Sequence, residues 1–145
     1  MNTRNGLGVF YVTIVESHKA EVRRAFEVLA HPGSYPVLIH CSVGKDRTGV
    51  VIALIHRLIG TPDAVILADY LTSHGELQPI RASIEWEVSK LGMSPEEFAG
   101  CKEEALIQML DHIDAKYGGV EGYLGAIGVS KNDQDKVRNN ILEVK

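Results

Sequence analysis

The stretch His40-Cys41-Ser42-Val43-Gly44-Lys45-Asp46-Arg47-Thr48-Gly49 places a cysteine six positions before an arginine, with a glycine between them. A short apolar run leads into this stretch, and a longer one follows it. These runs predict a short buried strand over residues 37–40 and a helix over residues 48–59. A loop that opens a helix presents backbone N–H groups without intrahelical partners at the positive end of the helix dipole, so the loop favours an anion.

Seven consecutive residues of this loop are expected to bind phosphate. Successive backbone N–H groups in a curled loop form an anion-binding nest. Gly44 suits the tightest point, where the chain needs a positive φ or a close approach to the anion. Arg47 adds a planar fork of donors that matches two phosphate oxygens. The predicted phosphate-binding residues are Ser42, Val43, Gly44, Lys45, Asp46, Arg47 and Thr48.

Cys41 lies at the mouth of this positive field, which favours the thiolate over the thiol. A cysteine at a helix N-terminus or beside a cation has a pKa of roughly 3.5–7.5, so we expect a nucleophilic thiolate at neutral pH. Its attack on a phosphate ester would give a phosphocysteine that water then hydrolyses. The loop N–H groups and Arg47 would hold the equatorial oxygens. Thr48 would cap the helix or hydrogen-bond the sulfur, and His40 would orient the loop.

The pattern His-Cys-x5-Arg-Thr-Gly at residues 40–49 resembles the signature of the cysteine-dependent protein tyrosine phosphatase superfamily. In its fuller form, His-Cys-x-x-Gly-Lys-Asp-Arg-Thr-Gly, it resembles the branch of bacterial and fungal tyrosine phosphatases with dual activity on phosphotyrosine and phosphoinositides. Weaker similarities lie between residues 50 and 71 and between residues 116 and 130, so the resemblance covers residues 20–144. It implies an α/β, protein-tyrosine-phosphatase-like fold and an enzyme that needs no metal or other cofactor. The implied substrate is a phosphorylated protein or a phosphoinositide.

Helical patterns account for most of the chain, which conflicts with the central sheet of the phosphatase fold. Residues 7–30 indicate a helix in two pieces that meet near Ser17, although residues 9–15 are also rich in strand-forming side chains. A lone strand at residues 37–40 would leave its backbone groups unpaired. We therefore expect one helix-rich domain over residues 1–145, the C-terminal part of the family fold, with few strands because it lacks the N-terminal portion that carries most of the sheet. The other expected helices are residues 62–73, 79–91, 94–97, 103–116, 120–127 and 130–142.

Asp46 and Lys45 each admit more than one role. In the superfamily, a general-acid aspartate usually lies on a separate loop upstream of the cysteine loop, and no aspartate precedes Asp46 in this chain. Asp46 is therefore a candidate for the catalytic acid that protonates the leaving oxygen. Alternatively, it binds a substrate hydroxyl or caps the start of the helix. Lys45 either contacts a second anionic group, such as an inositol phosphate, or strengthens the positive field.

Composition argues against several other classes of protein. The formal net charge is −4, so no broad basic surface invites nucleic acid. The longest apolar run, residues 50–59, is too short for a transmembrane segment, which takes about 20 residues. The residues around Gly44 and Lys45 do not complete a nucleotide-binding P-loop. Cys101 is expected to be a buried structural thiol. A working thiolate at Cys41 needs a reducing compartment, so we expect a cytoplasmic protein.

Two functions are consistent with these observations. The first is a phosphatase with Cys41 as the nucleophile, Arg47 as the phosphate clamp and Asp46 as a provisional acid. The second is a truncated, inactive form that binds phosphate or traps substrate, because the sequence shows neither an upstream acid nor most of a sheet.

Overall fold

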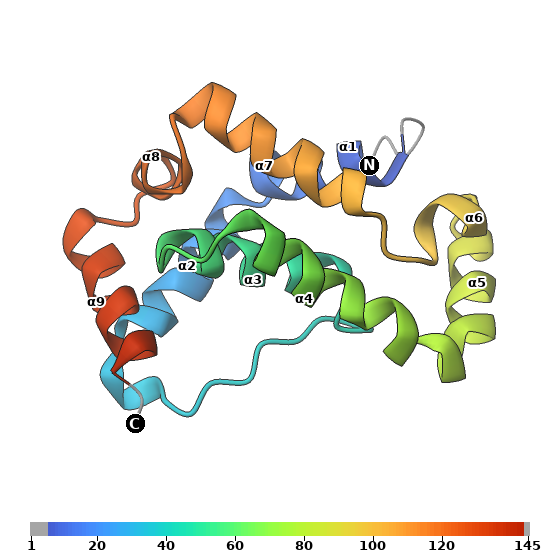
Figure 1. The fold of residues 1–145 in the computed structure, drawn as a ribbon, viewed down its shortest axis with the longest axis horizontal. Coiled ribbons are helices and arrows are strands. Elements are labelled where there is room, and N and C mark those ends of the chain that lie inside the picture. Colours follow the sequence, from blue (N-terminus) through green and yellow to red (C-terminus); the bar gives the residue numbers. More distant parts are fainter. Residues whose placement is uncertain (1–5, 144–145) are drawn as a thin grey trace.

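The computed structural model describes residues 6–143, and its regular elements are helices (Figure 1). The predicted domain covers residues 1–145, so its first five and last two residues lie outside the described part. The elements are α1 (Gly6–Ser17), α2 (Lys19–Ala30), η2 (Pro32–Ser34), α3 (Asp46–Leu58), α4 (Asp63–Glu76), η3 (Gln78–Ile80), α5 (Arg81–Lys90), α6 (Pro95–Phe98), α7 (Glu103–Tyr117), α8 (Val120–Ala126) and α9 (Lys131–Leu142).

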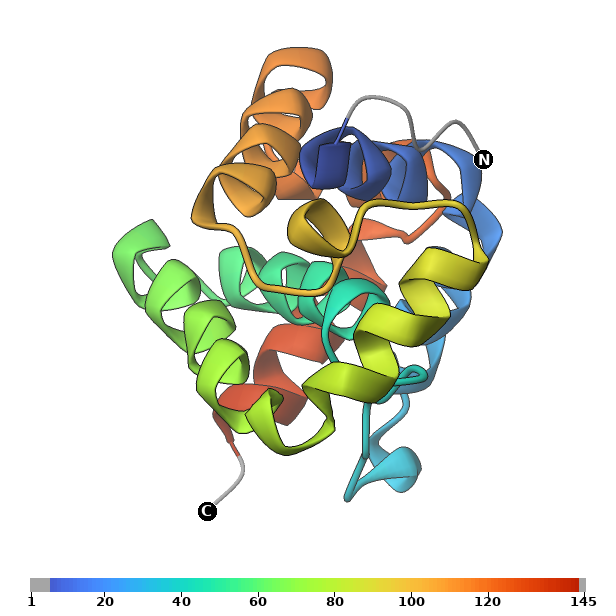
Figure 2. The same ribbon diagram turned by 90° about the vertical axis from the view of Figure 1, so that its right-hand side faces the viewer.

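The core forms where these helices meet around α3. Helix α1 lies along α7 and α2 lies along α9, while α3 contacts α1, α4 and α8 (Figures 1 and 2). Apolar spacing explains this packing, because the residues of α7 at i, i+3, i+4 and i+7 from Leu106 are all buried. Tyr11 of α1, Leu54 of α3 and Tyr123 of α8 are completely buried among these helices. The helix that follows the cysteine loop is therefore held by its neighbours along most of its length.

The strand predicted at residues 37–40 is wrong for the described part of the chain. The segment is extended in the ribbon (Figure 1), but residues 36–44 make no backbone–backbone hydrogen bond with any other residue of 6–143. Val37 and Ile39 pack partly against the core, whereas Leu38 between them is 84% exposed. The side chains thus alternate as in a strand, but a strand also needs a neighbour for its backbone groups. Of the expected α/β class, the helix-rich part is confirmed, and residues 6–143 contain no sheet.

Most of the predicted helices are confirmed, with shifted ends. Residues 9–15 are helical, and the two N-terminal helices meet at His18, next to the predicted break at Ser17. Helix α3 begins at Asp46, two residues earlier than predicted, so Asp46 lies in its first turn. Helix α4 extends to Glu76 and is preceded by Pro62 as its N-cap residue.

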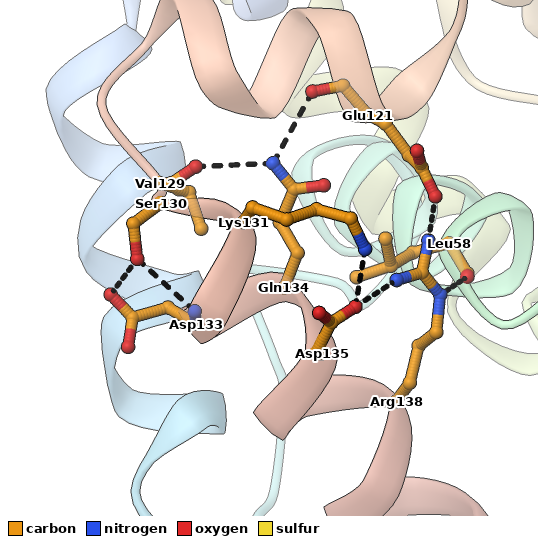
Figure 3. Close-up of polar contacts among 9 residues, drawn as sticks. All are labelled: Leu58, Glu121, Val129, Ser130, Lys131, Asp133, Gln134, Asp135 and Arg138. Carbon is orange, nitrogen blue, oxygen red and sulfur yellow. Dashed lines mark hydrogen bonds and ion pairs between the residues drawn. The ribbon is translucent and has the colours of Figure 1, made fainter.

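The last helix is attached to the far end of α3 (Figure 3). Helix α9 begins after Ser130, whose hydroxyl accepts a hydrogen bond from the Asp133 N–H at 3.1 Å. Arg138 donates from Nε to the carbonyl oxygen of Leu58 at 2.7 Å and from Nη1 to Asp135 at 2.7 Å. Leu58 is the last residue of α3, and a cation beside helix C-terminal carbonyls is stabilised by the helix dipole. The C-terminal end of α3 is therefore anchored opposite the cysteine loop.

Candidate active site

The loop before α3 turns sharply and carries Cys41 to the start of this helix. Gly44 has a φ of +70°, a left-handed conformation that strains any residue with a Cβ, so the chain turns where the sequence predicts. Lys45 is the N-cap residue of α3, and its side chain does not cap the helix. The first N–H groups of α3 therefore remain for an acceptor in the loop.

The Cys41 thiol is such an acceptor. Burial raises the pKa of this half-buried thiol, but polar contacts with the Thr48 hydroxyl and with the backbone N–H groups of Thr48, Val43 and Gly44 lower it by more. The pKa consequently falls from 9.0 to about 7. Thr48 Oγ1 is buried, and its contact with the sulfur falls short of full hydrogen-bond geometry, so this hydroxyl remains a donor for a thiolate or a phosphate oxygen.

Arg47 lies in the first turn of α3 with an exposed side chain. Its guanidinium makes no hydrogen bond or ion pair with residues 6–143, whereas the guanidinium groups of Arg57 in α3 and Arg138 in α9 donate to carboxylates. A guanidinium carries five N–H donors and stays charged at any physiological pH. Arg47 is therefore available to an anionic ligand, as its place in the sequence predicts.

Lys45 does not turn its charge outward, which disfavours the first of its two expected roles, contact with a second anion. Its side chain is 1% exposed. The ammonium donates to Asp46 Oδ1 at 2.5 Å, to the Phe98 carbonyl oxygen at 3.1 Å and to the Gly100 carbonyl oxygen at 3.0 Å. The physical reason is local competition: the Phe98 carbonyl at the end of α6, the Gly100 carbonyl of the following connection and the Asp46 carboxylate replace water around the cation.

Asp46 accepts hydrogen bonds from two side chains, and one of them was not foreseen from the sequence. Its Oδ1 accepts from Lys45 and also from the Tyr11 hydroxyl at 2.7 Å. The Tyr11 hydroxyl lies 2.6 Å from the Tyr70 hydroxyl of α4. Tyr11 stands in an apolar helical run, where its spacing is that of an ordinary core residue, so no sequence signal distinguishes it. The structure thus brings residues of α1, α3 and α4 together behind the loop.

A cavity of about 370 Å³ adjoins the loop on the side of α4. Val43, Gly44 and Thr48 of the loop line it together with Asp69 and Glu76 of α4. The cavity gives the loop a concave neighbour, in which apolar walls of α3 and α4 are interrupted by a few polar groups.

Cys101 differs from Cys41 in both place and chemistry. It lies in the connection between α6 and α7 and is half-buried, so the expected burial of this thiol is found only in part. Burial raises the pKa of the Cys101 thiol, and the nearby Asp46 carboxylate adds to this rise against the opposing effect of Lys45. Cys101 is therefore a weaker nucleophile than Cys41 at neutral pH.

No three side chains of His, Cys, Asp or Glu within residues 6–143 are grouped so that they could hold a metal ion. In the same range, every helix is too short or too polar to cross a membrane.

Comparison with known proteins finds a matching family and several relatives. A model of the "Tyrosine phosphatase family" matches residues 1–143. The triple specificity protein phosphatase PtpB of Mycobacterium tuberculosis is 34% identical over 121 residues, which cover 74% of this chain and 44% of that protein. A tyrosine-protein phosphatase of Nostoc commune is 33% identical over 144 residues, or 92% of this chain and 49% of that protein.

A shorter match, 38% identical over 47 residues, joins 32% of this chain to 17% of the inositol diphosphatase SIW14 of Saccharomyces cerevisiae. The chain spans less than half the length of the Mycobacterium and Nostoc relatives. With the family model matching nearly every residue and the cysteine loop folded at the start of α3, the chain belongs to the tyrosine phosphatase family.

Proposed function

We propose that this chain carries the phosphate-binding and nucleophilic half of a cysteine-dependent phosphatase that hydrolyses phosphoric monoesters. The observation that carries the proposal is the Cys41 thiol, whose pKa falls to about 7 at the N-terminus of α3, six positions before an exposed arginine. A thiolate that coexists with an anion-binding loop at neutral pH combines a nucleophile with a cradle for its target.

The reaction follows from the donors around the loop. The Cys41 thiolate attacks phosphorus, the bond from phosphorus to the ester oxygen breaks, and the leaving oxygen takes a proton from solvent water to give the alcohol or phenol. Water then attacks the phosphocysteine, which releases inorganic phosphate and restores the thiolate. Arg47 and the N–H groups of residues 42–48 hold the equatorial oxygens through both steps. The Thr48 hydroxyl stabilises the sulfur as it leaves in the second step, because it is buried beside it.

The proposed substrates are phosphotyrosine proteins, phosphoinositides or both, acted on in the cytoplasm, where thiols stay reduced. The names of the relatives support this range, because they include tyrosine-protein phosphatases, a triple specificity phosphatase and an inositol diphosphatase. The exposed Arg47 offers a site for the phosphate, and the cavity beside α4 adjoins the same loop at Val43, Gly44 and Thr48.

The test is turnover of p-nitrophenyl phosphate by the purified 145-residue chain without added metal, beside the variants Cys41→Ser and Arg47→Lys. We expect turnover by the parent and none by Cys41→Ser. Arg47→Lys is expected to lose about a hundredfold or more, because lysine keeps the charge but loses the bidentate fork. Rapid acid quenching with a radiolabelled ester should trap label on the parent and not on Cys41→Ser.

The same experiment tests the second function, the inactive phosphate-binding form. The observation that favours it is the extended segment of residues 36–44, which lacks backbone partners within the described part of the chain. If the parent is as inert as Cys41→Ser and still binds orthovanadate, the phosphatase proposal fails for this chain and the binding form replaces it.

A further inference from the structure

We propose that Asp46 is not the acid of the reaction but a positioning residue, held by Tyr11 and serving as the counter-ion of Lys45. The side chains of Tyr70, Tyr11, Asp46 and Lys45 form one continuous chain of polar contacts, called here the loop clamp. The proposal rests on the proposed phosphatase function, because it assigns the work of a residue in the same loop.

The donors of Lys45 are all used inside the protein. An ammonium has three N–H donors and no acceptor. The three acceptors within reach are Asp46 Oδ1, the Phe98 carbonyl and the Gly100 carbonyl. One of them is a carboxylate, and a cation that is 1% exposed is stable only with such a counter-charge.

Asp46 cannot serve as a proton donor without dismantling this arrangement. A general acid must be protonated before the leaving oxygen departs. A protonated Asp46 would be neutral. Its Oδ1 could still accept a hydrogen bond, but the buried Lys45 cation would lose its counter-charge. Removing one partner of a buried ion pair is far more costly than removing a surface charge.

The two tyrosines determine in which direction the hydrogen bonds of the loop clamp are donated. A phenol has a single proton, and Tyr11 donates its own to Asp46 at 2.7 Å. Tyr70 must then donate to Tyr11 across the 2.6 Å contact. Burial raises the pKa of both phenols, and the Asp46 charge adds to this effect, so both remain donors. Tyr11 is 0% exposed and Tyr70 is 5% exposed, so both phenols are shielded from solvent, and the Tyr70 side chain also lines the cavity beside the loop.

The clamp acts on the nucleophile through the backbone. Lys45 and Asp46 lie between Gly44 and Thr48, whose N–H groups lower the pKa of Cys41. The clamp ties these two residues to α1, to α4 and to the connection at residues 98–100. Loss of a contact in the clamp therefore makes the positions of the N–H groups around the sulfur less well defined, but it removes none of these donors.

The first measurement separates an acid from a positioning residue by the leaving group. Asp46→Asn is compared with the parent on p-nitrophenyl phosphate, which has a good leaving group, and on phenyl phosphate, which has a poor one. Loss of an acid costs much more on phenyl phosphate, because that oxygen needs the proton. We expect Asp46→Asn to slow both esters by the same factor within about threefold, as loss of loop geometry requires.

The second measurement uses Tyr11→Phe, which removes a single hydroxyl and leaves the Asp46 carboxyl in place. The thiol pKa is taken from the pH dependence of iodoacetamide alkylation in a Cys101→Ser background. Orthovanadate affinity reports the anion site without any need for an acid. We expect the thiol pKa to rise from about 7 toward 9 and vanadate to bind about tenfold more weakly. Tyr123→Phe, which removes a buried hydroxyl bonded to the Val15 carbonyl in the core, should change neither value.

The leaving-group comparison and the Tyr11→Phe measurements can each overturn the proposal. A loss for Asp46→Asn that is at least tenfold larger on phenyl phosphate, or a Tyr11→Phe variant with unchanged thiol pKa and vanadate affinity, overturns the proposal. If the parent hydrolyses neither ester, the phosphatase function fails for this chain, and the thiol pKa of Tyr11→Phe alone decides on the clamp. If Asp46→Asn does not fold, as judged by circular dichroism, the same Tyr11→Phe measurements decide.

Discussion

The Nε atom of Arg138 donates to the carbonyl oxygen of Leu58 at 2.7 Å, which joins the last helix to the end of α3, 80 residues earlier in the chain (Figure 3). This carbonyl belongs to a helix end, where acceptors have no intrahelical donor. The contact therefore satisfies a group that would otherwise depend on water, and it lies at the opposite end of α3 from the cysteine loop.

Arg138→Met should lower the free energy of unfolding by about 1–2 kcal/mol, because methionine keeps the apolar stem but leaves the Leu58 carbonyl without its donor. Urea unfolding followed by circular dichroism measures this change. Lys131→Met is the matched control. Lys131 is paired with Asp135 on the exposed surface of α9, and its replacement should cost about 0.5 kcal/mol or less. Equal losses in the two variants would contradict the anchoring role of Arg138.

Gly44→Ala should destabilise the protein by about 1–2 kcal/mol, because alanine is strained at a φ of +70°. A Cβ there would meet nothing within 4 Å, so the cost is one of backbone conformation and not of crowding. Vanadate binding should weaken as well, since the N–H of residue 44 would turn away from the sulfur.

Gly75→Ala supplies the control for this prediction. Gly75 lies inside helix α4, and a Cβ there also meets nothing within 4 Å. Alanine is the better helix former, so this variant should gain about 0.5–1 kcal/mol. Thermal unfolding of both variants should therefore show shifts of opposite sign, and a gain in both would show that residue 44 does not need the left-handed conformation.

Alkylation of Cys41 should follow a titration with a midpoint near pH 7, because the reactive species is the thiolate and its pKa is about 7. The rate rises through that midpoint and levels off above it. Thr48→Val should move the midpoint upward, because it removes a hydroxyl that lowers the pKa of the sulfur. The measurement is the rate of carboxymethylation against pH, read by mass spectrometry at the peptide of residue 41. A midpoint that stays the same in Thr48→Val would argue against the contact.

Glu16 should make the stability of the protein sensitive to acid. Its carboxylate contacts His112 at 2.7 Å, the Tyr117 hydroxyl at 2.8 Å and two lysine ammonium groups. Burial raises the pKa of this carboxyl, but the hydrogen bonds outweigh burial and hold the pKa well below its usual value of 4.5. Because the folded-state pKa is the lower one, the contribution is complete above 4.5 and disappears as the pH falls toward the folded-state pKa.

Glu16→Gln should therefore be less stable than the parent at pH 7, and the difference between them should narrow as the pH falls below about 4.5. Urea midpoints at pH 7, 5, 4 and 3 measure this convergence. Glu21→Gln is the control: its carboxylate is 72% exposed and lies 3.8 Å from His18 alone, so its effect should be small throughout. A constant difference for Glu16→Gln at all four pH values would contradict the assignment.

The position and chemistry of the cysteine loop could be predicted because the residues that determine them are consecutive in the sequence. Cys41, Gly44 and Arg47 have roles that depend on their spacing and on the helix that follows, and both are visible in the sequence. The inward direction of Lys45 was not predictable. It depends on the carbonyls of Phe98 and Gly100, which lie 53 and 55 residues further along the chain.

The remaining differences have similar causes. Tyr11 has the spacing of a core residue, and only the fold shows that its hydroxyl meets Asp46. The strand predicted at residues 37–40 was wrong because a strand is defined by its neighbour, whereas its own sequence shows only a tendency to be extended. Residues whose roles are local could thus be identified, and residues whose roles depend on distant partners could not.

The extended segment of residues 36–44 gives the sulfur of Cys41 a mechanical role in addition to its chemical one. The segment has no backbone–backbone hydrogen bonds to the rest of the described chain, yet the Cys41 sulfur contacts the hydroxyl and the backbone N–H of Thr48 in α3. The Cys41 sulfur therefore also attaches this segment to α3, and the attachment is stronger when the thiol is ionised, because a thiolate is the better hydrogen-bond acceptor. A reagent that modifies the sulfur should therefore release the segment of residues 36–44 from α3 as well as remove the nucleophile.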